Sequence, residues 1–274
     1  TDPPAILADL QTQMSGDFPV LSESSKKYEI RYVPAQLEST LSPAFYLTAP
    51  LDDPTRNVIY INNGSTSAKD ELYPTLAHAG FPGHPYQTVY FREHTHNPLA
   101  ALLTCSGANE GWATYVEQLS YFYDNDLSEE NSAYQAAMRS FSLCFHSLLD
   151  IGINYDGWSK DRAAAFVRTC FDADDALVEE LWQTMIDTPP NYLEYAGGYV
   201  EIMEMREEEE KQLADILTIA QSNLDHTREQ IRSLSEEVND LMETYGPQDK
   251  AAHSLLRNTQ AQLQESRRNL VRCE

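Results

Sequence analysis

The sequence has few basic residues and no long apolar run, and each absence excludes a class of protein. Its 274 residues include 19 Lys and Arg against 43 Asp and Glu, which gives a formal net charge of −24. Nonspecific binding to nucleic acid or to an anionic membrane needs a basic surface. No apolar segment is long enough to cross a bilayer. We therefore expect no nucleic-acid partner and no membrane span.

The sequence also lacks closely paired cysteines and a recognisable leader. Its four cysteines are widely spaced without a CxxC pattern. This spacing favours free, buried thiols, with a single disulfide as the alternative. The first residues, Thr1 to Pro4, do not read as a signal peptide. The sequence does not fix the cellular location. The protein could be cytoplasmic, or exported if a signal once preceded Thr1.

Composition divides the chain into two segments. Residues 1–206 mix aromatics, prolines and irregular spacing, whereas residues 207–274 lack Trp and Phe and contain a single proline. In the second segment, apolar residues recur by four and three over 213–245 and again over 252–273, which is a heptad pattern. Gly246-Pro247 lies between them and ends the first helix. The pattern predicts an antiparallel coiled-coil hairpin at 207–274.

The first segment is expected to be mainly α with a small β element. Short β-branched and aromatic runs predict strands at 29–33 and 57–61. Amphipathic spacing predicts helices over 73–79, 101–123, 128–150, 160–170, 174–186 and 194–245.

Two histidines flank a Pro-Gly sequence in the first segment. His78 and His84 are six residues apart, and Glu110 follows in a later amphipathic helix. Two imidazoles and a carboxylate form the ligand set of a catalytic zinc site. On a straight helix this spacing would point the imidazoles apart, so the backbone between them must kink. The intervening glycines and proline permit that kink.

Other polar side chains could support such a site. Glu117 shares a helix face with Glu110 and could orient a ligating imidazole, although a solvated helix face is the alternative. Tyr195 and Tyr199 could donate hydrogen bonds to an oxyanion beside a metal, or could form an aromatic packing stripe. The residue types alone leave both pairs of alternatives open.

The first segment resembles the bacterial DUF885 family of predicted zinc peptidases, which is related to the gluzincins. The resemblance covers residues 1–206 in family order and implies the C-terminal half of a gluzincin-like helical metallopeptidase domain. It rests on Ser42–Leu47, Asn57–Asn62, Leu72–His78, Pro82–His84 with Tyr86-Gln87, Glu110–Glu117, Asp150–Gly152 with Gly157-Trp158, and Tyr195–Arg206.

The resemblance implies roles for particular residues. His78, His84 and Glu110 would bind Zn²⁺, and a peptide would be the substrate. Zinc lowers the pKa of bound water and polarises the scissile carbonyl. Tyr195 or Tyr199 would stabilise the oxyanion.

The sequence departs from the family pattern in three ways. The pattern reads His-Glu-Gly-x-Pro-Gly-His, but Ala79 stands where the glutamate would act as general base. Asn154 occupies a place where the pattern has histidine, which is expected to weaken a contact near the site. The family's N-terminal helical half has no counterpart here. The site is therefore expected to bind zinc while hydrolysing peptides slowly or not at all.

The second segment resembles a different family, and two further hypotheses follow. Residues 207–274 are similar to the N-terminal helical hairpin of RNA polymerase-associated superfamily 1 helicases. No Walker motif is present, so helicase activity is excluded. One alternative to the peptidase-like reading is a non-catalytic interaction protein whose hairpin docks a partner such as RNA polymerase. The other is a truncated or fused gene product.

Overall fold

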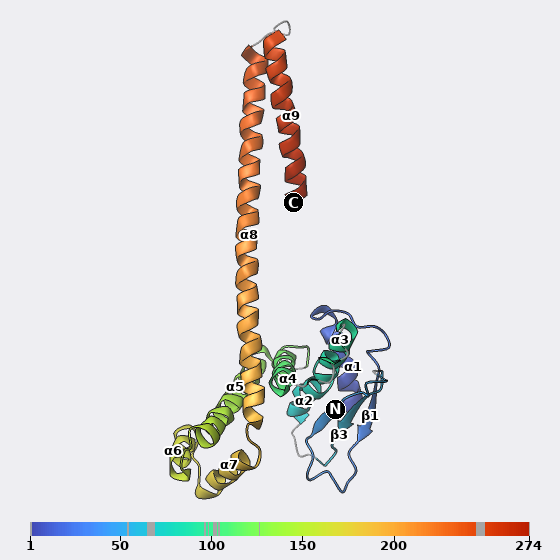
Figure 1. Cartoon of the computed structure of the whole chain (residues 1–274), viewed down its shortest axis with the longest axis vertical. Coiled ribbons are helices and arrows are strands. Elements are labelled where there is room, and N and C mark those ends of the chain that lie inside the picture. The colour runs from blue at the N-terminus through green and yellow to red at the C-terminus, as the bar shows by residue number, and fades with distance from the viewer. Residues whose placement is uncertain are drawn as a thin grey trace. The chain divides into compact units, whose positions relative to one another are not determined.

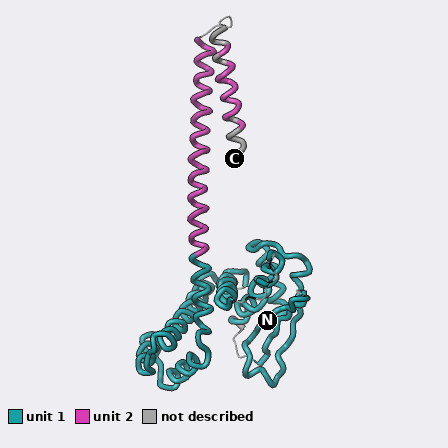
Figure 2. Tube along the Cα trace, in the orientation of Figure 1, with its two compact units in different colours: residues 1–204 teal, residues 205–274 magenta. Residues whose placement is uncertain are grey.

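The chain folds into helices and one small sheet, arranged in two compact units. The computed structural model describes residues 2–53, 55–64, 69–95, 97, 99–100, 103, 105–125, 127–244 and 250–273. The first unit is Thr1–Glu204 and the second is Met205–Glu274 (Figure 2). The division falls inside helix α8 (Asn191–Thr244). The prediction of a mainly α fold with a small β element is confirmed.

The sheet of the first unit has three strands in the order β1-β3-β2. Strand β1 (Tyr28–Tyr32) pairs in parallel with β3 (Asn57–Ile61), and β2 (Ala44–Leu47) pairs antiparallel with β3. The central strand is buried along nearly its whole length, as expected for the apolar run Asn-Val-Ile-Tyr-Ile.

Helices α1 (Pro3–Gln13) and α2 (Lys69–Ala79) pack against this sheet. Their shared core includes Leu7, Ile59 and Leu76, each fully buried. Burying an aliphatic side chain of this size stabilises the fold by about 1.5–3 kcal/mol. This core fixes α2, which carries His78, against the sheet.

Helices α3 (His84–His94) and α4 (Ser106–Ser120) follow α2. A separate core of Met14, Leu21, Phe81, Tyr86 and Val89 holds α3 against the chain that follows α1. Helix α4 packs on α2 and α3. Helices α2, α3 and α4 therefore meet at one place in the first unit.

The rest of the first unit has its own core. Helices α5 (Glu129–Asp150), α6 (Lys160–Cys170) and α7 (Asp175–Asp187) and the π-helical turn η3 (Ile151–Tyr155) pack around Phe145, Leu149, Val167 and Met185. Side-chain oxygens of Ser128, Ser159 and Asp174 accept hydrogen bonds from the first turns of α5, α6 and α7. Such N-caps explain where these helices begin.

In the second unit, α8 runs antiparallel to α9 (Lys250–Cys273) (Figure 1). Val238, Thr259 and Leu263 are buried along the seam. The predicted turn at Gly246-Pro247 lies outside the described residues. Leu213 and Leu217, two positions of the predicted heptad, are 56 % and 60 % exposed.

Several sequence-based boundaries need correction. The helix predicted over 101–123 runs from Ser106 to Ser120; residues 101, 102 and 104 lie outside the described residues. The helix predicted at 73–79 begins at Lys69 and contains Pro74. Helices α1 and α3 and strand β2 were not predicted.

The cysteine prediction is half right. Cys105, Cys144 and Cys170 are free, as expected, but they are exposed rather than buried. Among the described residues, no helix combines the length and the apolar character needed to cross a membrane.

Candidate metal centre

The His78–His84 segment is a break between two helices. Helix α2 ends at Ala79 and α3 begins at His84, so the two histidines lie on different helices rather than on one kinked helix. A Cβ atom on Gly83 would lie 1.8 Å from the carbonyl oxygen of His78. Glycine is therefore required for this close turn. The turn explains how a spacing of six brings both imidazoles to one place.

Glu110 and Tyr195 reach the same place through a close crossing of α4 and the start of α8. A Cβ atom on Gly111 would lie 2.3 Å from the carbonyl carbon of Gly198. The two backbones thus touch with no side chain between them. The ring of Tyr195 stacks on the ring of His78 at a centroid distance of 5.7 Å.

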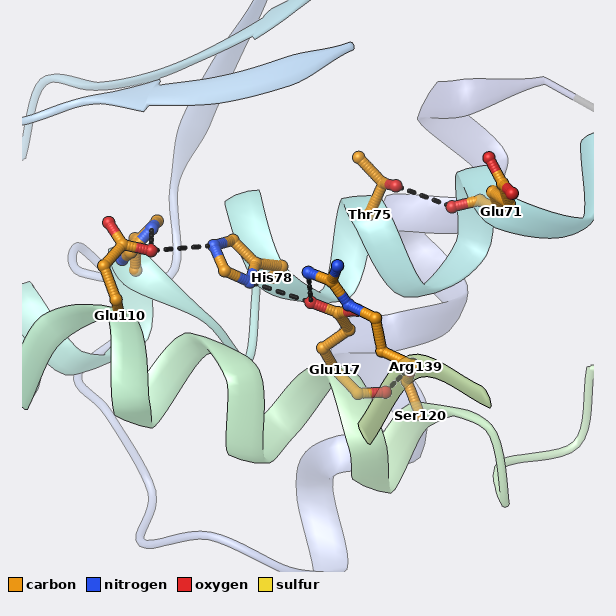
Figure 3. Close-up of polar contacts among 8 residues, drawn as sticks. Glu71, Thr75, His78, Glu110, Glu117, Ser120 and Arg139 are labelled. Carbon is orange, nitrogen blue, oxygen red and sulfur yellow. Dashed lines mark hydrogen bonds and ion pairs between the residues drawn. The ribbon is translucent and has the colours of Figure 1, made fainter. Parts of the chain in front are cut away.

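The three predicted ligands converge. Nε2 of His78 lies 3.2 Å from Oε2 of Glu110, and Nε2 of His84 lies 3.7 Å from the same oxygen. One ligand atom from each of the three residues lies within 4.8 Å of the other two. All three side chains are partly buried. Figure 3 shows Glu110 and His78 pointing toward one another.

The second nitrogen of His78 is held by a carboxylate. Nδ1 of His78 lies 3.1 Å from Oε2 of Glu117, which is only 6 % exposed. Arg139 of α5 donates from Nε to Oε1 of Glu117 at 2.5 Å and from Nη2 to Oε2 at 3.2 Å (Figure 3). In the tautomer that carries its proton on Nδ1, His78 donates to Glu117 and keeps Nε2 available for a metal ion.

Burial and charge set the protonation of the histidines. Burial alone would lower the pKa of His78, but the carboxylates of Glu110 and Glu117 outweigh it and raise that pKa. Burial, with the charge of His78, lowers the pKa of His84 to about 4. His84 is therefore neutral near pH 7, as a metal ligand must be.

The carboxylates stay ionised despite their burial. Burial raises the pKa of Glu110, but His78 and His84 reverse the effect and lower it. The pKa of Glu117 is lowered in the same way by His78 and Arg139. Both groups therefore carry negative charge at neutral pH.

One buried oxygen lies between the two imidazoles. Oε2 of Glu110 meets no hydrogen-bond geometry among the described residues, but it is in ion-pair contact with Nε2 of His78 and lies near Nε2 of His84. A proton or a cation must lie between this oxygen and each nitrogen, because their lone pairs would otherwise face one another. A cation bound between this oxygen and the two Nε2 atoms would satisfy this requirement. The donor set of two imidazoles and one carboxylate fits zinc.

Comparison with models of protein families identifies the family of this chain. The model of the family described as "Bacterial protein of unknown function (DUF885)" matches residues 4–222. The chain belongs to the DUF885 family. The match extends past the predicted boundary at residue 206 and past the division between the two units at Glu204. No curated protein matches the chain.

Two solved structures share the fold of this DUF885 chain. One is described as "the putative lipoprotein from Colwellia psychrerythraea": the TM-score is 0.62 and the identity 20 %, over 78 % of this chain and 37 % of that one. The other is a "putative lipoprotein of unknown function from Shewanella oneidensis", with a TM-score of 0.52 and 17 % identity, over 77 % and 41 % of the two chains. The DUF885 chain therefore spans well under half the length of either.

Ala79 does not face open space. It is 2 % exposed and belongs to the core formed by the sheet, α1 and α2. Its methyl group has no acid–base chemistry, so the residue next to His78 supplies no base.

The two predicted tyrosines differ in position. Burial, followed by the negative charge of Glu110, raises the pKa of Tyr195. Its phenol therefore stays protonated beside the convergent ligands and can donate a hydrogen bond. Tyr199 lies one turn later in α8 and is partly buried. The ring contact with His78 is made by Tyr195.

A cleft opens beside the centre. It has a volume of about 700 Å³, and its walls include Glu71, His78, Glu117, Arg139 and Tyr195. Ser42, Pro43 and Ala44, the last of which begins strand β2, form another part of the wall. A cleft of this size can hold several residues of an extended peptide.

Sequence reasoning missed Arg139, and the structure shows which groups Asn154 contacts. Arg139 is the one Lys or Arg in α5, and that isolated basic residue in an amphipathic helix was the available signal. Asn154 donates to Oδ1 of Asp150 and to the carbonyl oxygen of Met185. It therefore ties η3 to α7 within the second core of the first unit.

Proposed function

We propose that this chain binds one zinc ion through His78, His84 and Glu110 and presents a peptide to it. In this proposal the chain is a metallopeptidase-like domain whose hydrolysis is impaired at position 79. The observation that carries the proposal is the convergence of three ligand atoms, from three helices, within 4.8 Å. The buried Oε2 of Glu110 supports it, because a cation between this oxygen and the two Nε2 atoms would compensate the buried negative charge.

The residues of the chain have distinct roles in this proposal. Bound zinc would act as a Lewis acid on the scissile carbonyl and would acidify a water molecule. Glu117, held by Arg139, keeps the proton of His78 on Nδ1. The protonated phenol of Tyr195 donates to the oxygen on which negative charge develops. The cleft beside His78 holds the peptide.

Ala79 limits the reaction. A glutamate after the first histidine takes the proton from the attacking water in zinc peptidases that carry one. Loss of a positioned general base lowers the rate by roughly a hundredfold to ten-thousandfold. We therefore assign binding, with very slow turnover, to the chain as it stands.

A pair of substitutions at position 79 tests this assignment. Ala79→Glu supplies a carboxylate, and Ala79→Gln is the matched control with nearly the same volume and no base. Both overfill a buried site, so circular dichroism and zinc content must first match the parent chain. Hydrolysis of a fluorogenic peptide panel by the glutamate variant alone is the expected result. Equal hydrolysis rates in zinc-loaded, folded forms of both variants would contradict the claim that the missing base at position 79 limits hydrolysis.

A second function is favoured by one observation in the hairpin. Leu213, Ile216 and Leu217 of α8 are 56–61 % exposed and share one helix face. An exposed apolar stripe of this kind suits a protein partner. Replacing Leu213 and Leu217 with Asp should abolish binding to purified bacterial RNA polymerase and leave zinc content unchanged. Unaltered binding would exclude this stripe as the docking site.

A further inference from the structure

A second cavity lies beside α3, and its wall includes one residue of α4. Its volume is about 850 Å³, within the range of ligand-binding pockets. Aromatic residues dominate its wall: Tyr86, Tyr90 and Phe91 from α3 and Trp112 from α4. The rings of Tyr86 and Trp112 are nearly parallel at a centroid distance of 5.9 Å, and those of Tyr86 and Tyr90 at 5.7 Å.

Three polar groups of this wall already have backbone hydrogen-bond partners. Tyr86 donates its hydroxyl to the carbonyl oxygen of Pro19, and Trp112 donates Nε1 to that of Pro82. Nδ1 of His94 lies 2.8 Å from the carbonyl oxygen of Tyr90. None of the described residues that line the cavity carries a carboxylate. The cavity thus offers ring faces to a ligand, which suits an apolar or aromatic group better than a cation.

Hydrogen bonds connect the cavity wall to the candidate ligands. Gln87 follows His84 by one helical turn and donates Nε2 to the carbonyl oxygen of Ala108, two residues before Glu110. Trp112 follows Glu110 by two residues, and its partner Pro82 lies between His78 and His84. The wall is therefore anchored to the backbone segments that carry all three ligands.

We propose that this cavity is a specificity pocket for an aromatic or large aliphatic side chain of the peptide. The proposal rests on the proposed function for its assignment to a peptide substrate. Binding of the side chain itself requires neither zinc nor hydrolysis, so it can be tested on metal-free protein.

The test compares two small amides by ligand-observed NMR on the metal-free, full-length chain. N-acetyl-L-phenylalaninamide carries the aromatic group, and N-acetylglycinamide is the same molecule without it. We expect measurable binding of the first only. Phe91→Ala should weaken that binding roughly tenfold, because it removes one ring from the wall. Phe91 is 46 % exposed, so this truncation should leave the fold intact.

Phe122→Ala is the matched control. Phe122 is 57 % exposed and does not line the cavity, so its loss should not change binding. Equal binding of the two amides, tighter binding of N-acetyl-L-lysinamide, or equal affinity in the Phe91→Ala variant would each overturn the proposal. If the phenylalanine amide binds as expected but the chain takes up no zinc, the pocket stands and the proposed metal function fails. If the chain binds zinc but not the phenylalanine amide, the proposed metal function stands and the pocket proposal fails.

Discussion

The buried carboxylate of Glu117 lies 3.1 Å from Nδ1 of His78, on the opposite side of the imidazole from Glu110. This contact makes His78 part of a carboxylate–histidine pair. It fixes both the orientation of the ring and the nitrogen that stays free. The carboxylate of such a pair usually tunes metal affinity through the histidine and does not bind the metal itself.

Glu117→Gln tests the role of this carboxylate. The amide keeps the volume but removes the charge that holds the proton on Nδ1. Zinc affinity should fall by about 10- to 100-fold, the usual loss when such a partner is removed. Competition titration with a zinc chelator measures it. Glu201→Gln, at an exposed position of α8, is the control and should bind zinc as tightly as the parent chain. Equal affinity in both variants would show that Glu117 does not tune the site.

Arg139→Met should lower stability. The substitution keeps much of the aliphatic stem but removes both hydrogen bonds to Glu117. A buried acceptor that loses its donor costs about 1–3 kcal/mol. Urea unfolding of the metal-free chain measures the loss. Combining Arg139→Met with Glu117→Gln should recover part of it, because no ionised carboxylate is then left unpaired. If the two losses simply add, the residues do not interact as the structure indicates.

The close crossing of α4 and α8 predicts opposite effects on stability when two glycines of α4 are replaced with alanine. Gly111→Ala places a methyl group 2.3 Å from backbone of Gly198 and should destabilise the chain by about 1–3 kcal/mol. Gly107→Ala places its methyl group in open space and should be neutral or stabilising by up to about 1 kcal/mol. Thermal unfolding of the two variants distinguishes them. Equal melting temperatures would contradict the close crossing.

The sequence alone predicted the candidate ligand residues, but it did not predict most of the contacts that hold them in place. The residue types and order of His78, His84 and Glu110 were enough to group them, because zinc chemistry restricts the ligand set. The contact of Gly111 with Gly198 joins segments far apart in the chain, and no local pattern specifies such a pairing. Strand β2 was missed because four residues at a sheet edge carry almost no periodicity. Helix α3 was missed because its aromatic run resembles a strand as much as a helix.

The hairpin offers a separate stability prediction. Leu263 is 9 % exposed in the seam between α8 and α9, whereas Leu217 is 60 % exposed. Leu263→Ala should destabilise the hairpin by about 2–3 kcal/mol, because it opens a cavity in the seam. Leu217→Ala should change its stability by less than about 0.5 kcal/mol. Limited proteolysis followed by mass spectrometry reports on cleavage within 205–274. Equal protection of the two variants would show that Leu263 does not hold the hairpin together.

Zinc stoichiometry tests the central claim most directly. The purified full-length chain is equilibrated with Zn²⁺, freed of loosely bound metal, and measured by inductively coupled plasma mass spectrometry. The His84→Ala variant removes one candidate ligand, and His226→Ala removes an exposed histidine from the hairpin. We predict one zinc per chain in the parent protein and in His226→Ala, and none in His84→Ala. A zinc-free parent protein, or an unchanged zinc content in His84→Ala, would contradict the account.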